Sequence, residues 1–158
     1  MASITTCLWH ANDAEEAANF YVSLVPDSRI DKVHRNPVDA PGGKAGTVLQ
    51  VEFTLAGRSF TTLNGGVGMP YTDAISISLT VDTQAEIDRL WAGLSAGGNE
   101  VQCGWLKDRY GVSWQIVPRQ LARLLGDADR EKAGRAMQAM LKMVKLDIAA
   151  LQRAFDGA

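Results

Sequence analysis

The first part of the chain changes its hydrophobic pattern twice. Residues 4–10 alternate apolar and polar positions, which is typical of a β-strand, and Asn12 or Asp13 can cap a helix directly after it. Apolar positions then follow at helical spacing as far as Leu24, behind two glutamates in the first turn, where acidic side chains suit the helix dipole. Three further strands are predicted at residues 28–35, 47–55 and 58–63. The pattern therefore predicts a βαβββ unit, with a Pro- and Gly-rich loop at residues 36–46.

The same order of elements repeats in the second half of the chain. Residues 74–81 predict a strand, and Asp82 or Thr83 can cap the helix that follows, which stops at Gly97. Two short strands are predicted at residues 101–106 and 112–117, with a hairpin turn at 108–111 between them. We interpret the chain as two βαβββ units placed one after the other. This interpretation rests on the order of elements, because the two halves share few identical residues.

After Pro118 the pattern becomes helical. Helical segments are predicted at residues 121–125, 127–143 and 146–155. An apolar stripe within them consists of Ala133, Met137, Met140, Leu141 and Val144. A methionine-rich stripe can hold a flexible ligand, but we interpret this one as core or subunit interface, the commoner use of such a stripe. The predicted organisation is a single domain, 1–158, made of module one at 1–66, module two at 72–118 and a C-terminal helical extension at 119–158.

Composition narrows the class of protein. The chain has 158 residues, of which 46% are hydrophobic and 22% charged, as in an ordinary globular domain with a core. A net charge of −2 offers no basic surface for nucleic acid. No apolar run approaches the roughly 20 residues needed to cross a bilayer, and the first residues lack the features of a signal peptide. We therefore expect a cytoplasmic protein that binds neither nucleic acid nor membranes.

The chain contains two cysteines, Cys7 and Cys103, which lie far apart in the sequence. Two are too few for a disulfide framework, and their spacing is not that of a metal knuckle or a redox pair. Free cysteines are among the most buried residue types. We therefore expect two buried free thiols.

Short motifs spread over nearly the whole chain carry a family resemblance. They are CLWH at 7–10, NFY at 19–21, PDS at 26–28, DTQAEID at 82–88, CGWLKD at 103–108 and GVSWQIVP at 111–118. In these motifs the chain resembles the PhnB-like branch of the glyoxalase/bleomycin-resistance, or vicinal-oxygen-chelate, superfamily. The resemblance implies an α+β fold in which two βαβββ modules form a curled mixed sheet, with C-terminal helices added here. It also implies a homodimer.

The resemblance allows a test for a metal site. Metal enzymes of the superfamily place one ligand, His or Glu as a rule, on each of four strands that face a common cup, where the ion holds vicinal oxygens as a Lewis acid. Three of these positions fall on Thr6, Ser76 and Gln115, and the remaining strand, 58–64, contains no His, Asp, Glu or Cys. Hydroxyls and neutral amides bind divalent transition metals poorly. The sequence therefore predicts neither a metal site nor a cofactor.

What remains is a predicted cup with polar, uncharged walls. Strand alternation is expected to turn seven side chains into it: Thr6, Leu8, His10, Ser76, Ser78, Ser113 and Gln115. Such a lining suits a small organic ligand held by a few hydrogen bonds. His10 is the candidate general base, although a hydrogen-bonded histidine at the rim with no catalytic role is the simpler interpretation.

Members of the PhnB-like group often carry the label 3-demethylubiquinone-9 3-methyltransferase. An adenosyl methyl donor commonly sits on a Gly-rich turn between a strand and a helix. The Gly cluster at 65–68 is followed by a predicted strand instead, so we interpret it as a loop and the label as an inherited name. The first functional hypothesis is thus a metal-free binder of a small organic molecule. The alternatives are a metal-independent isomerase, lyase or transferase, and an interaction module that acts through the C-terminal helices.

Overall fold

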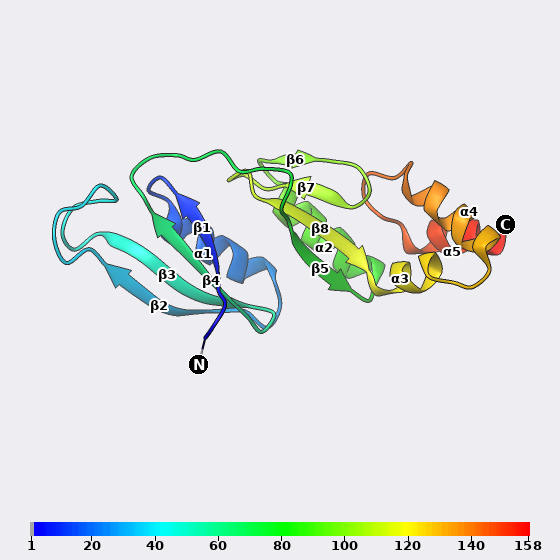
Figure 1. Cartoon of the computed structure of the whole chain (residues 1–158), viewed down its shortest axis with the longest axis horizontal. Coiled ribbons are helices and arrows are strands. Elements are labelled where there is room, and N and C mark those ends of the chain that lie inside the picture. Colours follow the sequence, from blue (N-terminus) through cyan, green and yellow to red (C-terminus); the bar gives the residue numbers. More distant parts are fainter. Residues whose placement is uncertain (1) are drawn as a thin grey trace. The chain divides into compact units, whose positions relative to one another are not determined.

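The structure, a computed structural model, describes residues 2–158 and divides into two compact units (Figure 1). One unit ends at Pro70 and the other begins at Tyr71. Each contains an open four-stranded mixed sheet, and the strands and helices of each follow the order βαβββ. The predicted α+β fold with two βαβββ modules and C-terminal helices is confirmed. The assignment of residues 1–158 to a single domain stays a prediction.

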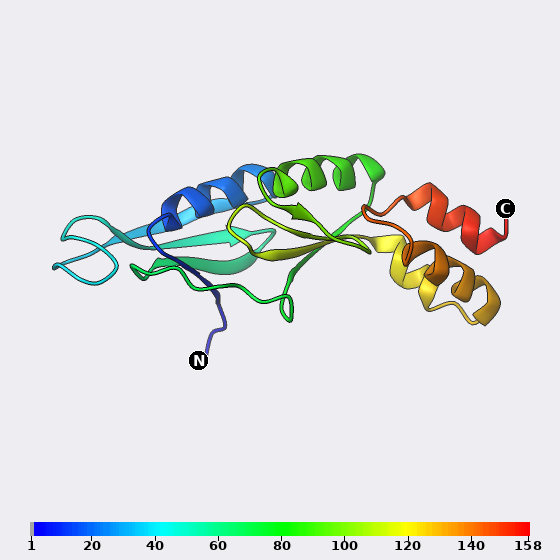
Figure 2. The same cartoon turned by 90° about the horizontal axis from the view of Figure 1, so that it is seen from above.

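The first unit consists of one helix and four strands. They are β1 (Thr6–His10), α1 (Ala14–Leu24), β2 (Arg29–Arg35), β3 (Val48–Leu55) and β4 (Arg58–Asn64). The strand order is β1-β4-β3-β2, with β1 parallel to β4 and the other neighbours antiparallel. Figure 2 shows α1 lying along one face of this sheet. The predicted bounds of these elements lie within two residues of the observed ones.

The core of the first unit lies between α1 and the sheet. The helix buries Tyr21 and three alanines, whose small side chains allow the backbone to approach the strands. The Tyr21 ring stacks on Phe53 at 6.3 Å between centroids, and Phe53 stacks on Phe60 at 5.6 Å. Phe53 and Phe60 are register partners on β3 and β4, so this aromatic row shows which face of the sheet α1 covers.

The second unit repeats the arrangement with shorter strands. Its elements are β5 (Ile77–Val81), α2 (Gln84–Ser95), β6 (Asn99–Glu100), β7 (Trp105–Lys107) and β8 (Ser113–Pro118), in the sheet order β5-β8-β7-β6. The strand predicted at 101–106 is wrong, because a turn divides that region between β6 and β7. Cys103 and Gly104 both adopt positive φ there, and their N–H groups donate to the carbonyls of Met143 and Val144. The turn thus depends on the C-terminal region, which no local pattern reveals.

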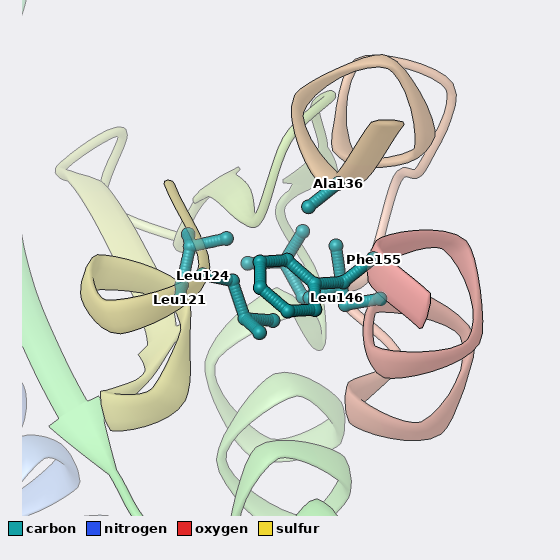
Figure 3. Close-up of a cluster of buried hydrophobic side chains, with 6 residues drawn as sticks. Leu121, Leu124, Ala136, Leu146 and Phe155 are labelled. Atoms are coloured by element: carbon teal, nitrogen blue, oxygen red, sulfur yellow. The ribbon is translucent and has the colours of Figure 1, made fainter. Parts of the chain in front are cut away.

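The chain ends in three helices with a core of their own. They are α3 (Arg119–Leu125), α4 (Arg130–Met140) and α5 (Ile148–Asp156). The buried cluster consists of Leu121, Leu124, Ala136, Leu146, Leu151 and Phe155, with Leu146 in the segment between α4 and α5. Figure 3 shows the cluster and labels all but Leu151. The Gln84 side chain on α2 forms two hydrogen bonds around the start of α5. It donates to the carbonyl of Leu146 and accepts from the N–H of Ile148. No helix within residues 2–158 is long and apolar enough to cross a membrane.

The predicted apolar stripe is divided by the structure. Ala133 is buried and Met140 packs against the helical core, as expected for core positions. Met137, Leu141 and Val144 are exposed instead. The stripe therefore covers a wider arc of the surface than the helical core can bury.

The two cysteines correct another expectation. Cys7 is exposed and Cys103 is only half-buried, so the prediction of two buried thiols is wrong. Cys7 is the register partner of Thr61 on β4. The neighbouring positions on β4, Phe60 and Thr62, face α1, and successive side chains of a strand point to opposite faces. Cys7 therefore points to the open face of the sheet, where no helix of its unit covers it.

Candidate functional site

The start of α1 is held by side chains from the sheet. The N–H of Ala14 donates to Asn64 Oδ1 at 2.9 Å, and the Thr62 hydroxyl donates to the carbonyl of Ala14 at 2.8 Å. Asn64 Nδ2 also donates to the carbonyl of Val48 at 3.0 Å, so one amide connects the helix to two strands. Asp13, at the N-cap position, makes no capping bond with its own side chain. A residue fifty positions away thus performs the capping that a local side chain commonly provides.

Asp13 uses its carboxylate to hold a buried histidine. His10 Nδ1 lies 2.9 Å from Asp13 Oδ1, and His10 is only 4% exposed. Since β1 is parallel to β4 with His10 opposite Asn64, the imidazole lies on the face of the sheet that α1 covers. The hydrogen bond fixes the orientation of both side chains at the point where the helix begins.

A pocket of about 590 Å³ lies at this end of α1. Its lining residues are Asn12, Asp13, Glu15, Glu16, Gly42, Gly43, Thr47, Val48 and Asn64. Three of the nine carry carboxylates, the N-cap Asp13 and the first-turn residues Glu15 and Glu16, and none is a lysine or arginine. The volume falls within the range of roughly 300–1,000 Å³ that is typical of small-molecule sites.

The loop on the other side of the pocket is held in place by hydrogen bonds. Asn36 is buried, its N–H donates to the carbonyl of Thr47, and its own carbonyl accepts from Gly46. Asp39 accepts from the N–H of Ala45 and from Lys44, and these two bonds lower the pKa of the Asp39 carboxyl. The loop at 36–46 is therefore an organised wall of the pocket.

A glycine is required where this loop meets β4. A Cβ at Gly42 would lie 2.1 Å from the carbonyl oxygen of Asn64, closer than any side chain can approach. The contact is with backbone, which cannot move aside as the end of a side chain can. Gly42 thus brings the loop against the same asparagine that caps α1.

In the second unit, the predicted site residues lie together. Gln115 Nε2 donates to the Ser76 hydroxyl at 2.8 Å, and Ser78 is the register partner of Gln115. Ser113 shares their face of β8, whereas Trp114 and Ile116 alternate with them and are fully buried. These four polar residues therefore share one face, as the alternation predicts. Their role in binding a ligand stays a prediction.

In the first unit, the predicted face is wrong. The register partners of Thr6, Leu8 and His10 are Phe60, Thr62 and Asn64, which face α1. The residues that point to the open face of β1 are Cys7 and Trp9. Alternation divides the residues of a strand into two sets but does not say which set faces the helix. Only the burial of one face beneath the helix decides this. The part that Thr6, Leu8 and His10 play in ligand binding stays a prediction, but they do not line the open face of the sheet.

Several pocket residues were not singled out from the sequence. Glu15 and Glu16 were assigned to the helix dipole, and Gly42 and Gly43 to an ordinary loop. The available signal was the density of carboxylates, three within the four residues 13–16. Asn64 left no such signal, because its partner Ala14 is distant in the sequence and close only in the fold.

The residues present do not fit the metal site of the superfamily's metalloenzymes. No group of three His, Cys, Asp or Glu side chains in the described part of the chain is placed to share a metal ion. Ser76 and Gln115 occupy two of the expected ligand positions, Thr6, expected at a third, faces α1, and β4 contains no His, Asp, Glu or Cys. The donor set is therefore wrong for a divalent transition metal.

The residues also do not fit the Gly-rich turn of an adenosyl methyl donor. The N–H groups of Gly65 and Gly66 donate to the carbonyls of His10 and Ala11, so these amides are already engaged. A Cβ at Gly65 would overlap the Trp9 ring, which shows that this glycine accommodates a protein side chain. The cluster is a loop that follows β4 and does not lead into a helix.

Two βαβββ units with open mixed sheets define the glyoxalase/bleomycin-resistance fold class. Two solved structures share this fold. The protein PA1353 from Pseudomonas aeruginosa has a TM-score of 0.63 at 19% identity, over 75% of this chain and 98% of its own. The fosfomycin resistance protein FosX from Listeria monocytogenes has a TM-score of 0.51 at 11% identity, over 75% of this chain and 93% of its own.

The family follows from sequence as well as structure. The family model 3-demethylubiquinone-9 3-methyltransferase matches residues 2–117. The PhnB protein from Bacillus cereus is 37% identical, with a TM-score of 0.67 over 74% of this chain and 99% of its own. The chain therefore belongs to this PhnB-like family. No protein of curated function matches it.

Proposed function

We propose that the protein binds a small organic molecule without a metal ion, in the pocket at the start of α1. The observation that carries this proposal is the pocket itself, about 590 Å³ in volume and framed by the helix, β4 and the loop at 36–46. The Asn64 side-chain amide connects the helix to β3 at this pocket. A preformed site of this kind avoids the cost of ordering its walls when the ligand binds. The homodimer and the cytoplasmic location remain part of the hypothesis.

The charge of the lining determines the class of ligand. Asp13, Glu15 and Glu16 are acceptors only when they are ionised, and none of the lining residues is a lysine or an arginine. A ligand that carries an ammonium group, or several hydrogen-bond donors, complements this wall. An anionic ligand would face three like charges. The proposed ligand class is therefore a small organic amine.

The test uses two compounds that differ in charge and share one ring. Phenethylamine carries an ammonium group, and phenylacetate carries a carboxylate. We expect phenethylamine to shift the backbone amide resonances of residues 12–16 and 42–43 in a two-dimensional NMR titration, and phenylacetate to leave them unchanged. The double variant Glu15→Gln/Glu16→Gln should weaken the binding of phenethylamine about fivefold, the upper range for exposed charge pairs.

A matched variant separates a local effect from a general one. Glu86→Gln removes one carboxylate at the start of α2, in the other unit, and should leave the dissociation constant unchanged. If both compounds shift the same resonances equally, or neither shifts any of them, the proposal is wrong. An equal effect of Glu86→Gln would also contradict it, because the attraction would then come from net charge alone.

A further inference from the structure

The pocket at the start of α1 and a buried histidine share one carboxylate. Asp13 lines the pocket, and its Oδ1 lies 2.9 Å from Nδ1 of His10. The His10 side chain is 2% exposed, whereas the Asp13 side chain is 41% exposed. The Asp13 carboxylate is therefore in contact with a buried imidazole and also forms part of the pocket wall.

The charge of this pair depends on one proton. A neutral imidazole that carries its proton on Nδ1 donates to the Asp13 carboxylate, which keeps its full charge. A second proton, on Nε2, makes the imidazole of His10 a cation, and the two side chains then form an ion pair. Histidine is the side chain that ordinarily changes its charge between pH 5 and pH 8. The net charge beside the pocket therefore depends on the protonation of a residue that does not itself line the pocket.

The helix packed against His10 contributes acidic groups. Glu15 and Glu16 line the pocket together with Asp13, and all three belong to the start of α1. Tyr21, the titratable side chain that α1 buries, stacks on an aromatic ring about two helical turns further along. The charged side chains at the start of α1 are therefore carboxylates.

The neighbouring elements place their charged groups elsewhere. Arg58 lies at the opposite end of β4 from the residue that pairs with the histidine, and Glu52 of β3 points to the open face of the sheet. Lys44 and Asp39 of the loop beside the pocket pair with each other at 2.9 Å. Arg35 donates to a backbone carbonyl of the same loop. The cations of these elements are therefore engaged with the loop or lie far along β4.

We propose that protonation of His10 regulates the pocket by weakening its affinity for a cationic ligand. This inference rests on the proposed function, because it concerns the same pocket and the same class of ligand. An imidazolium 2.9 Å from the Asp13 carboxylate offsets its charge, so the attraction between Asp13 and an ammonium group in the pocket falls. Such coupling is reciprocal, so a bound ammonium group opposes the protonation of His10 to the same degree.

The experiment measures the dissociation constant of phenethylamine with the full chain at pH 8 and at pH 5.5. An aliphatic amine stays protonated over this range, and carboxylates ordinarily titrate below it. We expect binding to be about threefold weaker at pH 5.5, as for the loss of one surface charge pair, and His10→Gln should remove this dependence on pH. The matched control is His34→Gln, at the other of the two histidines, which should keep the dependence because His34 is bonded to Glu52 and does not line the pocket.

A second measurement needs no variant, and it decides alone if His10→Gln does not fold. NMR follows the ring protons of both histidines through a pH titration, with and without saturating phenethylamine. Threefold coupling requires the bound amine to move the titration of His10 to lower pH by about 0.5 of a pH unit. The titration of His34 should stay in place.

The outcomes separate this inference from the proposed function. Absence of binding at both pH values would contradict the proposed function, and this inference with it. Equal affinity at both pH values, or a dependence on pH that persists in His10→Gln, would overturn the regulation and leave the amine site intact. Tighter binding at pH 5.5 would also overturn the regulation, because an imidazolium beside Asp13 can only oppose a cation.

Discussion

The helices α1 and α2 occupy the same place in two βαβββ units, yet their first turns are capped differently. At α2, the Thr83 hydroxyl accepts from the N–H of Glu86 at 3.2 Å, and the Glu86 carboxylate accepts from the N–H of Thr83 at 2.9 Å. These are the two halves of a capping box within four consecutive residues. At α1, the N–H of Ala14 is satisfied by Asn64 from β4.

The difference shows what a distant cap makes available. In α2 the carboxylate of the first-turn acid, Glu86, accepts a hydrogen bond from the backbone of the N-cap residue Thr83. In α1 the cap comes from the sheet, so Asp13 is available to bind His10, and Glu15 and Glu16 line the pocket. In the unit with the local cap, residues of the helix N-terminus itself provide the capping hydrogen bonds. The unit with the distant cap places acidic side chains in the wall of a pocket.

The largest expected effect comes from removing the distant cap. Asn64→Ala leaves the buried N–H of Ala14 without its partner, which costs about 1–3 kcal/mol, and removes a second hydrogen bond at the half-buried carbonyl of Val48. We expect the free energy of unfolding to fall by about 2–3 kcal/mol in urea denaturation. The control is Asn19→Ala, at an exposed asparagine of α1 whose side chain donates to the carbonyl of Glu15, and there we expect a change within about 0.5 kcal/mol. Equal losses in both variants would show that the cap at Asn64 is not special.

A smaller effect is expected from removing the local cap. Thr83→Ala eliminates the hydroxyl that accepts from Glu86, and loss of an N-cap side chain costs about 1 kcal/mol. Urea denaturation measures the change. Thr83→Ser keeps a hydroxyl in the same place and should remain close to the unaltered chain. If Thr83→Ala lowers the free energy of unfolding more than Asn64→Ala does, the local cap contributes more stability than the distant one, contrary to our expectation.

The smallest effect concerns the charge of Glu86. Hydrogen bonds from the Thr83 hydroxyl, the Thr83 N–H and the Asp82 N–H lower the pKa of the Glu86 carboxyl below its ordinary value of 4.5. Because the pKa of Glu86 is lower in the folded chain than in the unfolded chain, the ionised carboxylate stabilises the fold at any pH above the pKa of the unfolded chain. This contribution to the free energy of unfolding is lost as the pH falls through the pKa of Glu86 in the folded chain. Glu86→Gln keeps an acceptor but no charge, so we expect the unaltered chain to be slightly more stable at pH 7.

The difference should shrink below about pH 4.5 and vanish once Glu86 is protonated in both states. Thermal unfolding of both chains between pH 3 and pH 7 measures it. Glu131→Gln is the matched control, an exposed first-turn acid of α4 for which the N-cap Asp129 provides the capping bonds. A difference that grows on acidification would contradict the assignment, because it would require a raised pKa.

Local patterns were sufficient for the elements themselves. The alternation before His10, the helical spacing up to Leu24 and the capping residues at 82–86 predicted strands and helices close to their observed bounds. The prediction was wrong at 101–106, where the backbone bonds of Cys103 and Gly104 run to residues some forty positions away. Interactions that close over long stretches of chain leave no local pattern to detect.

The candidate site divides in the same way. The four predicted residues of the second unit share a face, because the buried Trp114 and Ile116 alternate with them in the sequence. In the first unit the phase of β1 was misassigned, since Leu8 and Trp9 are both apolar and neither marks the buried side. The pocket itself combines residues from 12 to 64, so no single window of sequence contains it.

The sequence by itself determined the family and the βαβββ repeat, because both depend on residue types and short spacings. Only the tertiary structure decided which face of β1 is buried, where the cap of α1 comes from and which acids line a pocket. The physical reason is that burial and hydrogen bonding depend on which segments meet in space. A residue such as Asn64 acquires its role from Ala14 and Val48, which only the folded chain brings to it.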